Sequence, residues 1–364
     1  MRRTTDAGSA SRNPAYLLRI AVASAAAIAI AFSGRAVIAQ QNIDFSKVNI
    51  DVIEVRPHVH MLVGAGGNTT IFDGPEGVMV VDTMFAPMAE KILAVIKSLT
   101  DAPIRYVVNT HFHPDHIGGN EIIAKAGRTR AGGNVVGDIG ADATDQATVL
   151  AHENVLNRLS MPEKGQPQVP FAAWPTETFA NDRKEMIFNG EAIQIIHEPA
   201  AHTDGDSVVF FRHNDVLATG DLFTTTMYPF IDAANGGTMD GEVKALNAIL
   251  DITIASNVNE GGTMVIPGHG RLCDEQDVIE YRDMATIIRD RIKEYVKRGL
   301  TLEQVKAKKP TLDFDPRYNT PNGFWDADKL VTEVYKEMSA EQPKAAPAPK
   351  GKSNGKTSKK GTAE

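Results

Sequence analysis

The segment His111-Phe112-His113-Pro114-Asp115-His116 constrains this chain most, because it places four metal-binding side chains within six residues. It follows the apolar run Ile104 to Val108, which has the composition of a buried strand. Neutral imidazole and carboxylate groups are the usual protein ligands of zinc and similar ions. His111 and His113 are two residues apart, so in an extended segment both project to the same side. The spacing favours one metal on this pair and a second metal on the adjacent Asp115-His116 pair.

A histidine-rich surface loop is the alternative interpretation of this segment. Three of the ten histidines of the chain fall within its six positions, and this clustering favours a metal site. Residues 111–116 are called the histidine box below.

The first 39 residues differ in composition from the rest of the chain. Arginines precede the apolar stretch Ile20 to Phe32, and Val37-Ile38-Ala39 places short side chains at a cleavage position. This order is typical of a secretory signal peptide over residues 1–39, with Gln40 as the start of the mature chain. The apolar stretch is short for a membrane span of ~20 residues, so an uncleaved anchor is the less favoured alternative. We therefore predict a periplasmic or secreted protein without stable membrane insertion.

Charge and cysteine content limit the partners of the chain. Removing five arginines and one aspartate with the leader changes the net charge from −8 to −12, which argues against a nucleic-acid partner. Residues 339–364 are rich in Lys, Ala, Pro, Gly and Ser and are predicted to form a disordered basic tail. Cys273 is the single cysteine, which excludes an internal disulfide. A small-molecule substrate is the predicted partner, and the oligomeric state is left open.

Residues 42–338 are predicted to form one α/β catalytic domain. Short apolar runs between turn residues predict strands over Val52–Val55, His60–Val63, Thr69–Phe72, Val78–Val81, Ile104–Val108, Ala192–Ile196, Ser207–Phe211, Val216–Ala218 and Met264–Ile266. Apolar residues at helical spacing predict helices over Ala86–Leu99, Ala141–Leu159 and Gly241–Leu250, and a helical C-terminal section over residues 277–338.

Two metal ions need more ligands than one loop provides. Three further candidates each follow a predicted strand, namely His202, Asp221 and His269. A ligand just beyond the end of a strand is held on a rigid frame while its loop stays open to substrate.

With these motifs the chain resembles the metallo-β-lactamase superfamily, in its glyoxalase II-like or broad metallo-hydrolase branch. The resemblance covers about Val52 to Cys273 and rests on Asp82, the histidine box, His202, Asp221 and His269, in the family's order. It implies a four-layered αβ/βα sandwich, to which this chain adds C-terminal helices. It also implies that His111, His113 and His202 hold one metal, that Asp115, His116 and His269 hold the second, and that Asp221 bridges them.

Several residues outside this ligand set receive structural or supporting roles. Asp82 is expected to hold a ligand histidine by a hydrogen bond without touching metal, its alternative being an ordinary turn residue. The remaining histidines are predicted to be structural: His58, His60, His152, His197 and His213. Cys273 is interpreted as a small buried residue and not as a ligand.

The resemblance implies a hydrolase with two zinc ions, although iron or a mixed metal pair is also compatible with these ligands. A metal-bridging hydroxide would attack an acyl bond in an ester, lactone, thioester or β-lactam, and Asp115 would orient the water or carry its proton. Asp221 occupies a position where some β-lactamases of the superfamily have a cysteine, which disfavours a β-lactamase in the strict sense. An iron-dependent persulfide-type oxygenase and a non-catalytic metal-binding protein are two less favoured functions for a chain of this kind.

The substrate itself is not encoded by any motif. Tyr228 and Phe230 follow Asp221 closely enough to lie on a loop at the mouth of the site, and we predict that both line the substrate pocket. The alternative role of both side chains is loop packing. The C-terminal helices are expected to cover one wall of the entrance.

Overall fold

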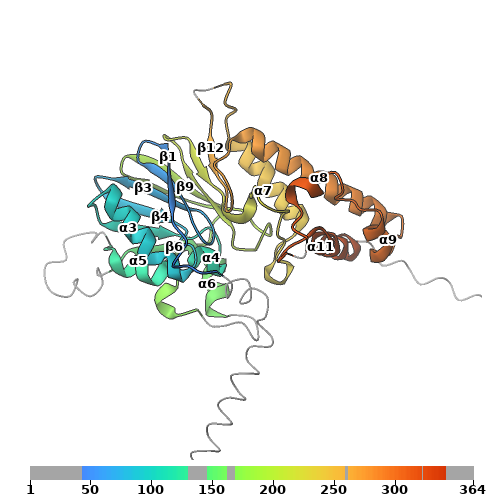
Figure 1. The fold of residues 1–364 in the computed structure, drawn as a ribbon, viewed down its shortest axis with the longest axis horizontal. Helices are drawn as coiled ribbons and strands as arrows, with labels where there is room; N and C mark the ends of the chain where they lie inside the picture. Colours follow the sequence, from blue (N-terminus) through green and yellow to red (C-terminus); the bar gives the residue numbers. More distant parts are fainter. Residues whose placement is uncertain (1–42, 130–145, 162–168, 259–260, 322, 342–364) are drawn as a thin grey trace, which may run out of the picture.

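The computed structural model describes residues 43–129, 146–161, 169–258, 261–321 and 323–341 (Figure 1). The predicted signal peptide lies outside these residues, as do positions 342–364 of the predicted tail. Among the helices within the described ranges, none combines the length and apolar character that crossing a membrane requires.

The first half of the chain builds a seven-stranded sheet in sequence order. Its antiparallel part contains β1 Asp51–Arg56, β2 Val59–Val63, β3 Thr69–Gly74 and β4 Gly77–Val81. Its parallel part adds β5 Ile104–Val108, β6 Thr148–His152 and β7 Glu177–Phe179. The short helix η1 (Ala86–Met88) leads into α3 (Ala89–Leu99), which with α5 (Asn120–Ala126) packs on the outer face of this sheet.

The second half builds a five-stranded sheet. Strands β8 Arg183–Phe188, β9 Glu191–His197, β10 Ser207–Phe211 and β11 Val216–Ala218 are antiparallel, and β12 Met264–Ile266 runs parallel to β11. Helices α7 (Met239–Ile252) and α8 (Glu275–Lys297) cover its outer face.

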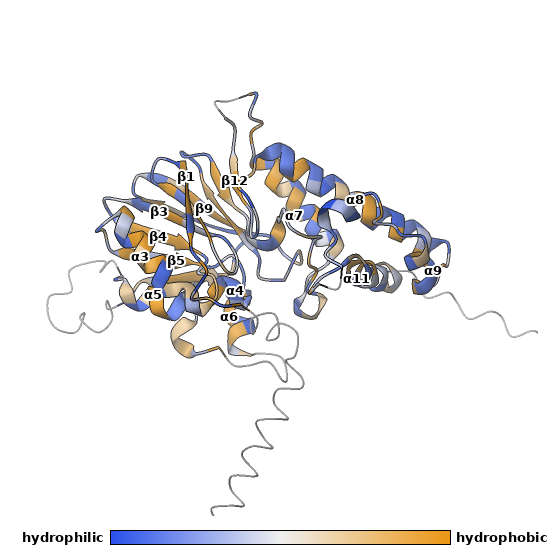
Figure 2. Cartoon of the chain, viewed as in Figure 1, coloured by the Kyte–Doolittle hydropathy of each residue, from blue (hydrophilic) through white to orange (hydrophobic). Residues whose placement is uncertain are grey.

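The two sheets pack face to face, with helices on both outsides (Figure 1). Phe72 of the first sheet lies 5.3 Å from Phe211 of the second, between ring centroids, within one buried apolar cluster. In Figure 2 the strands are largely hydrophobic, whereas α8 carries both hydrophobic and hydrophilic residues along its length. Each fully buried Val, Ile or Phe contributes ~1.5–3 kcal/mol relative to exposure, so this interlayer core holds the sandwich together. The predicted four-layered fold is confirmed.

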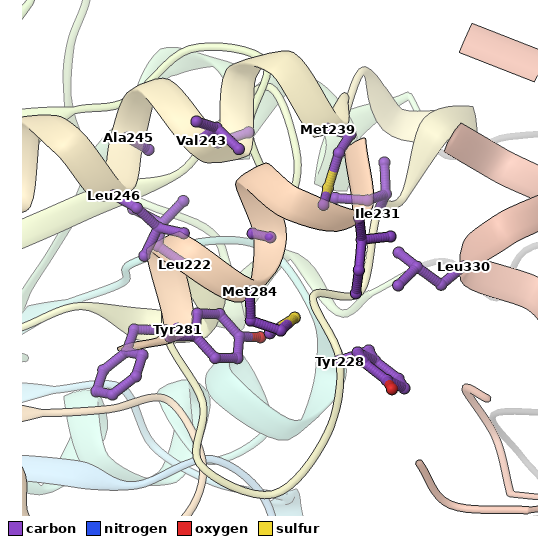
Figure 3. Close-up of a cluster of buried hydrophobic side chains, with 14 of the residues drawn as sticks. Leu222, Tyr228, Ile231, Met239, Val243, Ala245, Leu246, Tyr281, Met284 and Leu330 are labelled. Atoms are coloured by element: carbon purple, nitrogen blue, oxygen red, sulfur yellow. The ribbon is translucent and has the colours of Figure 1, made fainter. Parts of the chain in front are cut away.

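The C-terminal section extends the outer helical layer. It comprises α8, α9 (Leu302–Ala307), α10 (Asp315–Tyr318) and α11 (Ala327–Ala340). The predicted apolar stripe of α8 is buried at Val278, Tyr281 and Ile288. Figure 3 shows part of this core, where Tyr228 lies near Ile231 and Leu330. α11 continues to Ala340, two positions into the predicted tail.

The helix predicted over Ala141–Leu159 is wrong in its middle part. Residues 141–145 lie outside the described residues, and Thr148–His152 forms β6. Four of its five residues are buried between β5 and β7, so parallel pairing overrides the helical spacing there. A helix, α6, begins only at Glu153. The apolar pattern does not predict β7 and β8, because two of the three residues of β7 are exposed and exposed residues alternate with partly buried ones in β8.

Candidate metal centre

The structure brings all seven predicted ligands together at one edge of the sandwich. The histidine box follows the end of β5, and its second half opens the short helix α4 (Pro114–Ile117). His202 lies between β9 and β10, Asp221 in η4 (Gly220–Leu222) after β11, and His269 after β12. β11 and β12 are parallel neighbours, so Asp221 and His269 lie at the same edge of their sheet. A hydrogen bond from Ser207 N to Thr110 O, 2.8 Å long, joins the segment after His202 to the residue before the histidine box.

The first cluster consists of His111, His113 and His202. His202 Nε2 lies 3.0 Å from His113 Nδ1, and the ring centroids of His111 and His202 are 4.9 Å apart. His111 and His202 are completely buried, whereas the side chain of His113 is 14% exposed. The open side of this cluster is therefore at His113.

The second cluster consists of Asp115, His116 and His269. His269 Nε2 lies 3.4 Å from both His116 Nε2 and Asp115 Oδ2. Side chains of Asp115 and His269 are 23% and 21% exposed, and His116 is fully buried. Solvent therefore reaches this cluster through the carboxylate and His269.

Asp221 lies between the clusters and directs one oxygen to each. Its Oδ2 is 4.0 Å from His111 Nε2 and 3.8 Å from His202 Nε2. Its Oδ1 is 3.1 Å from His116 Nε2 and 3.3 Å from His269 Nε2. Gly268 makes this placement sterically feasible, because a Cβ there would lie 2.1 Å from Asp221 Oδ1.

The ring contacts of the first cluster fit a metal ion. In His202 and His113, the ring nitrogen that points away from the other ring donates a hydrogen bond. His202 Nδ1 donates to Phe230 O at 2.5 Å, and His113 Nε2 donates to Asp232 Oδ2 at 3.0 Å. The two nitrogens that face each other at 3.0 Å are then both lone pairs, a repulsive contact unless a cation lies between them. Among the described residues, the buried His111 Nε2 also lacks a hydrogen-bond partner. Buried polar atoms are almost always paired, so this atom suits metal ligation.

Asp82 connects the two clusters from behind. Its Oδ2 accepts hydrogen bonds from His116 Nδ1 at 2.7 Å and Thr110 Oγ1 at 2.6 Å, and its Oδ1 accepts one from Thr110 N. Because the Thr110 hydroxyl donates to Asp82, it accepts from His111 Nδ1 at 3.0 Å. One carboxylate thus sets the tautomers of His111 and His116 and leaves both Nε2 atoms free for metal. The hydrogen bond predicted between Asp82 and a ligand histidine is present.

The two clusters differ in their affinity for protons. Burial lowers the pKa of His111 well below its usual value, and burial with nearby His113 lowers the pKa of His202 to about 4. Burial also opposes protonation of His116 and His269, but carboxylates led by Asp221 outweigh it. The pKa of His116 is therefore well above its usual value, and the pKa of His269 is raised to about 10.

We expect the clusters to bind metal with different pH dependence. His111 and His202 are unprotonated at neutral pH, whereas a metal in the second cluster must displace protons from His116 and His269. The affinity of the second cluster therefore rises as the pH increases toward the pKa of His269, about 10. Calorimetric zinc titrations in buffers of different ionisation enthalpy measure the released protons. We expect roughly one to two protons with the second-cluster metal and fewer with the first, and equal release in both steps would contradict this account.

The two predicted pocket residues have different positions. Phe230 stacks on His113, with ring centroids 5.7 Å apart. The prediction for Tyr228 is wrong, because its side chain is fully buried and its hydroxyl donates to Asp315 Oδ1 at 2.8 Å in the C-terminal section. Tyr228 instead serves loop packing.

The other histidines that the sequence analysis predicts to be structural lie apart from the seven predicted ligands. His58, in the turn before β2, and His60, in β2, pair with Asp73 of β3 at the opposite edge. His152 stacks on His197 at a centroid distance of 3.6 Å. Cys273 is buried, and its thiol donates to a backbone carbonyl.

The sequence does not indicate the roles of several residues that shape the site. Asp232 lies on the predicted mouth loop, and no spacing rule connects it with His113. Thr110 precedes the box, but its contact with Asp82 depends on the fold. Gly67 has the sequence context of a turn residue, although a Cβ there would overlap the His116 ring at 2.1 Å.

Comparisons with known proteins place this geometry in a family. The family model of the metallo-beta-lactamase superfamily matches residues 62–309. A linear primary-alkylsulfatase of a Pseudomonas species is 25% identical over 265 residues, or 65% of this chain and 49% of that protein. The alpha subunit of a Nocardioides 2,4-dinitroanisole O-demethylase is 25% identical over 181 residues, or 49% of this chain and 48% of that subunit.

The chain spans about half the length of the curated relatives it matches. Among solved structures, an inverting sec-alkylsulfatase of a Pseudomonas species aligns with a TM-score of 0.58 at 18% identity, over 79% of this chain and 50% of that chain. This likeness concerns the fold alone. Because the family model covers well over half of the sequence, the chain belongs to the metallo-beta-lactamase superfamily.

Proposed function

We propose that this protein is an exported hydrolase that uses two zinc ions to cleave an acyl bond in an ester, lactone, thioester or β-lactam. The position of Asp221 carries the proposal, because one carboxylate directs an oxygen to each of two three-ligand clusters. Imidazole and carboxylate donors suit zinc, and the pattern of residues 1–39 supports export.

The proposed mechanism divides roles among the residues of the site. Two bound divalent ions would lower the pKa of a shared water and polarise the substrate oxygen. His111, His113 and His202 would hold one ion, and Asp115, His116 and His269 the second, with Asp221 between them.

Asp115 is the residue proposed to orient the attacking water and carry its proton. It is among the more exposed of the seven ligands, and its pKa is lowered to about 2, since His116 and His269 outweigh the effect of burial. An ionised carboxylate accepts a hydrogen bond from water at neutral pH.

Hydrolysis of a sulfate ester is the second candidate. The match to the primary-alkylsulfatase, 25% identical over 65% of this chain, favours it. The two candidates share the metal centre and differ in the electrophile, which is carbon in an acyl ester and either sulfur or alkyl carbon in an alkyl sulfate.

A substrate panel separates the candidates. Zinc-loaded mature protein is assayed on carboxylic esters, acyl lactones, thioesters, nitrocefin and primary and secondary alkyl sulfates, with a chelator-treated sample as the control. Chelator-sensitive turnover of an acyl substrate supports the first candidate. Turnover of alkyl sulfates alone replaces it with the second, and inactivity on the whole panel despite two bound zinc ions contradicts both.

Aromatic side chains next to the first cluster are proposed to contact an apolar part of the substrate. Phe230 stacks on His113 and lies 5.0 Å from Phe324, between ring centroids. Phe324 is 46% exposed, unusual for a large apolar side chain so close to the metal ligands.

Replacing Phe324→Ala should weaken binding of long-chain substrates more than short-chain ones. Loss of a partly exposed aromatic contact is expected to raise KM for a long-chain ester or sulfate by roughly three- to thirtyfold, with kcat little changed. Steady-state kinetics on a chain-length series measure this. Phe171→Ala, which removes an 80% exposed phenylalanine outside the aromatic contacts of the metal centre, is the control. An equal change for all chain lengths would contradict the proposed contact.

A further inference from the structure

The loop Met227–Asp232 supplies a supporting hydrogen bond to two ligands of the first cluster. Its Phe230 carbonyl accepts from His202 Nδ1 at 2.5 Å, and its Asp232 carboxylate accepts from His113 Nε2 at 3.0 Å. Asn235 Nδ2 also donates to Asp232 at 2.8 Å and fixes the carboxylate. The conformation of this loop therefore determines the orientation of both rings.

The same loop is held from its opposite side by the C-terminal section. Trp325 Nε1 donates to the Pro229 carbonyl at 2.8 Å, and the Trp325 ring lies 4.8 Å from the Phe230 ring, between centroids. The Tyr228 hydroxyl donates to Asp315 at 2.8 Å. Tyr228 is fully buried and Trp325 is only 7% exposed, so water cannot readily replace either hydrogen bond.

The contacts to the C-terminal section and to the metal ligands lie on adjacent residues of the loop. The Pro229 carbonyl is bonded to the C-terminal section, and the next carbonyl, that of Phe230, is bonded to a metal ligand. Because peptide units are planar and the intervening residue has only two soft torsions, displacement of the first carbonyl moves the second. Figure 3 shows Tyr228 on the side of Leu330 in α11.

We propose that Trp325 is a positioning residue for the first metal, acting through the loop Met227–Asp232, with Tyr228 and Asp315 as the second attachment. The C-terminal section thus sets the metal affinity of the first cluster as well as extending the core. This inference rests on the proposed two-metal function. It concerns the first cluster because the two ligand histidines that the loop supports, His113 and His202, both belong to that cluster.

The test is a zinc titration of the full chain against a chelating indicator, which resolves two binding steps. Trp325→Phe removes the N–H donor but keeps an aromatic ring. It should weaken one step by roughly three- to tenfold, less than the 10–100-fold expected for a direct partner of a metal-bound histidine. Asp232→Asn changes such a direct partner and should weaken the same step more strongly, which assigns that step to the first cluster.

The chain offers a matched control in its second tryptophan. Trp174 Nε1 donates to the Val169 carbonyl at 3.0 Å, and Trp174→Phe should leave both steps unchanged. Denaturant unfolding verifies that each variant is folded. If Trp325→Phe fails to fold, Tyr228→Phe takes its place, with Tyr335→Phe as control, since the Tyr335 hydroxyl bonds Leu300 O in the same section.

Two results overturn the inference: wild-type affinity in both steps of the variant, or equal weakening of both. A wild-type chain that binds fewer than two zinc ions instead overturns the proposed function, so the two failures are distinguishable.

Discussion

Replacing Asp221→Ala is expected to lower kcat/KM by roughly a thousandfold or more, because the several kcal/mol of transition-state stabilisation from a correctly held metal pair are lost. Asp221 Oδ1 lies 3.1 Å from His116 Nε2, and Oδ2 lies 3.8 Å from His202 Nε2, so one substitution removes a ligand from each cluster. Zinc content, measured by elemental analysis after gel filtration, should fall below two equivalents in parallel.

Asp73→Ala is a matched control for this variant. The Asp73 side chain is 13% exposed, against 14% for Asp221, and it also pairs with two histidines, His58 and His60, at the opposite edge. We expect this control to retain two zinc ions and wild-type turnover. Full turnover in Asp221→Ala would show that Asp221 has no bridging role.

Asp82→Asn should weaken the binding of both metals by roughly 10–100-fold each, although Asp82 is not itself a predicted ligand. Its Oδ2 accepts hydrogen bonds from His116 Nδ1 and the Thr110 hydroxyl, and its Oδ1 accepts one from Thr110 N. An amide accepts on only one of its two arms, so its NH2 group must face either the Thr110 N–H or the two donors at Oδ2. Asp82 has φ of +58°, a conformation that asparagine tolerates, so the backbone accommodates the change. Zinc affinities from chelator competition measure the effect.

Thr110→Val tests separately the two hydrogen-bonded paths from Asp82, of which one leads to His116 and the other leads through Thr110 to His111. The variant removes the hydroxyl that accepts from His111 Nδ1 and leaves the Asp82 bond to His116 in place. Only the first-cluster affinity should then fall. If Asp82→Asn weakened one metal alone, Asp82 would not connect the clusters.

The ligand positions were predictable because each follows a strand that the sequence marks by apolar composition. The strands that precede the histidine box, Asp221 and His269 have the predicted bounds, namely Ile104–Val108, Val216–Ala218 and Met264–Ile266. The strand before His202, predicted over Ala192–Ile196, spans Glu191–His197. Residues just past the ends of the neighbouring parallel strands β11 and β12 meet at one edge, and the packing of the two sheets brings them to the histidine box after β5. The grouping of these ligands into two clusters came from the family resemblance, and the structure places the residues accordingly.

The predictions from sequence fail where contacts between residues far apart in the chain determine the position of a side chain or the type of an element. Tyr228 lies in sequence between Asp221 and Phe230, yet its ring is buried against the C-terminal section. Spacing along the chain cannot show which side of a loop faces the metals. The roles of Asp232 and Trp325 escape prediction for the same reason, since their partners are 119 and 96 residues away. Thr148–His152 has helical spacing but forms a strand, because its burial depends on two neighbouring strands.

The most direct test of the two-metal site is a crystal structure of the zinc-soaked protein with anomalous diffraction at the zinc edge. We expect two anomalous peaks about 3.5–4 Å apart, one beside His111, His113 and His202 and one beside Asp115, His116 and His269, with one Asp221 oxygen bound to each. A single peak, or two peaks with Asp221 bound to only one, would contradict the proposed bridging site.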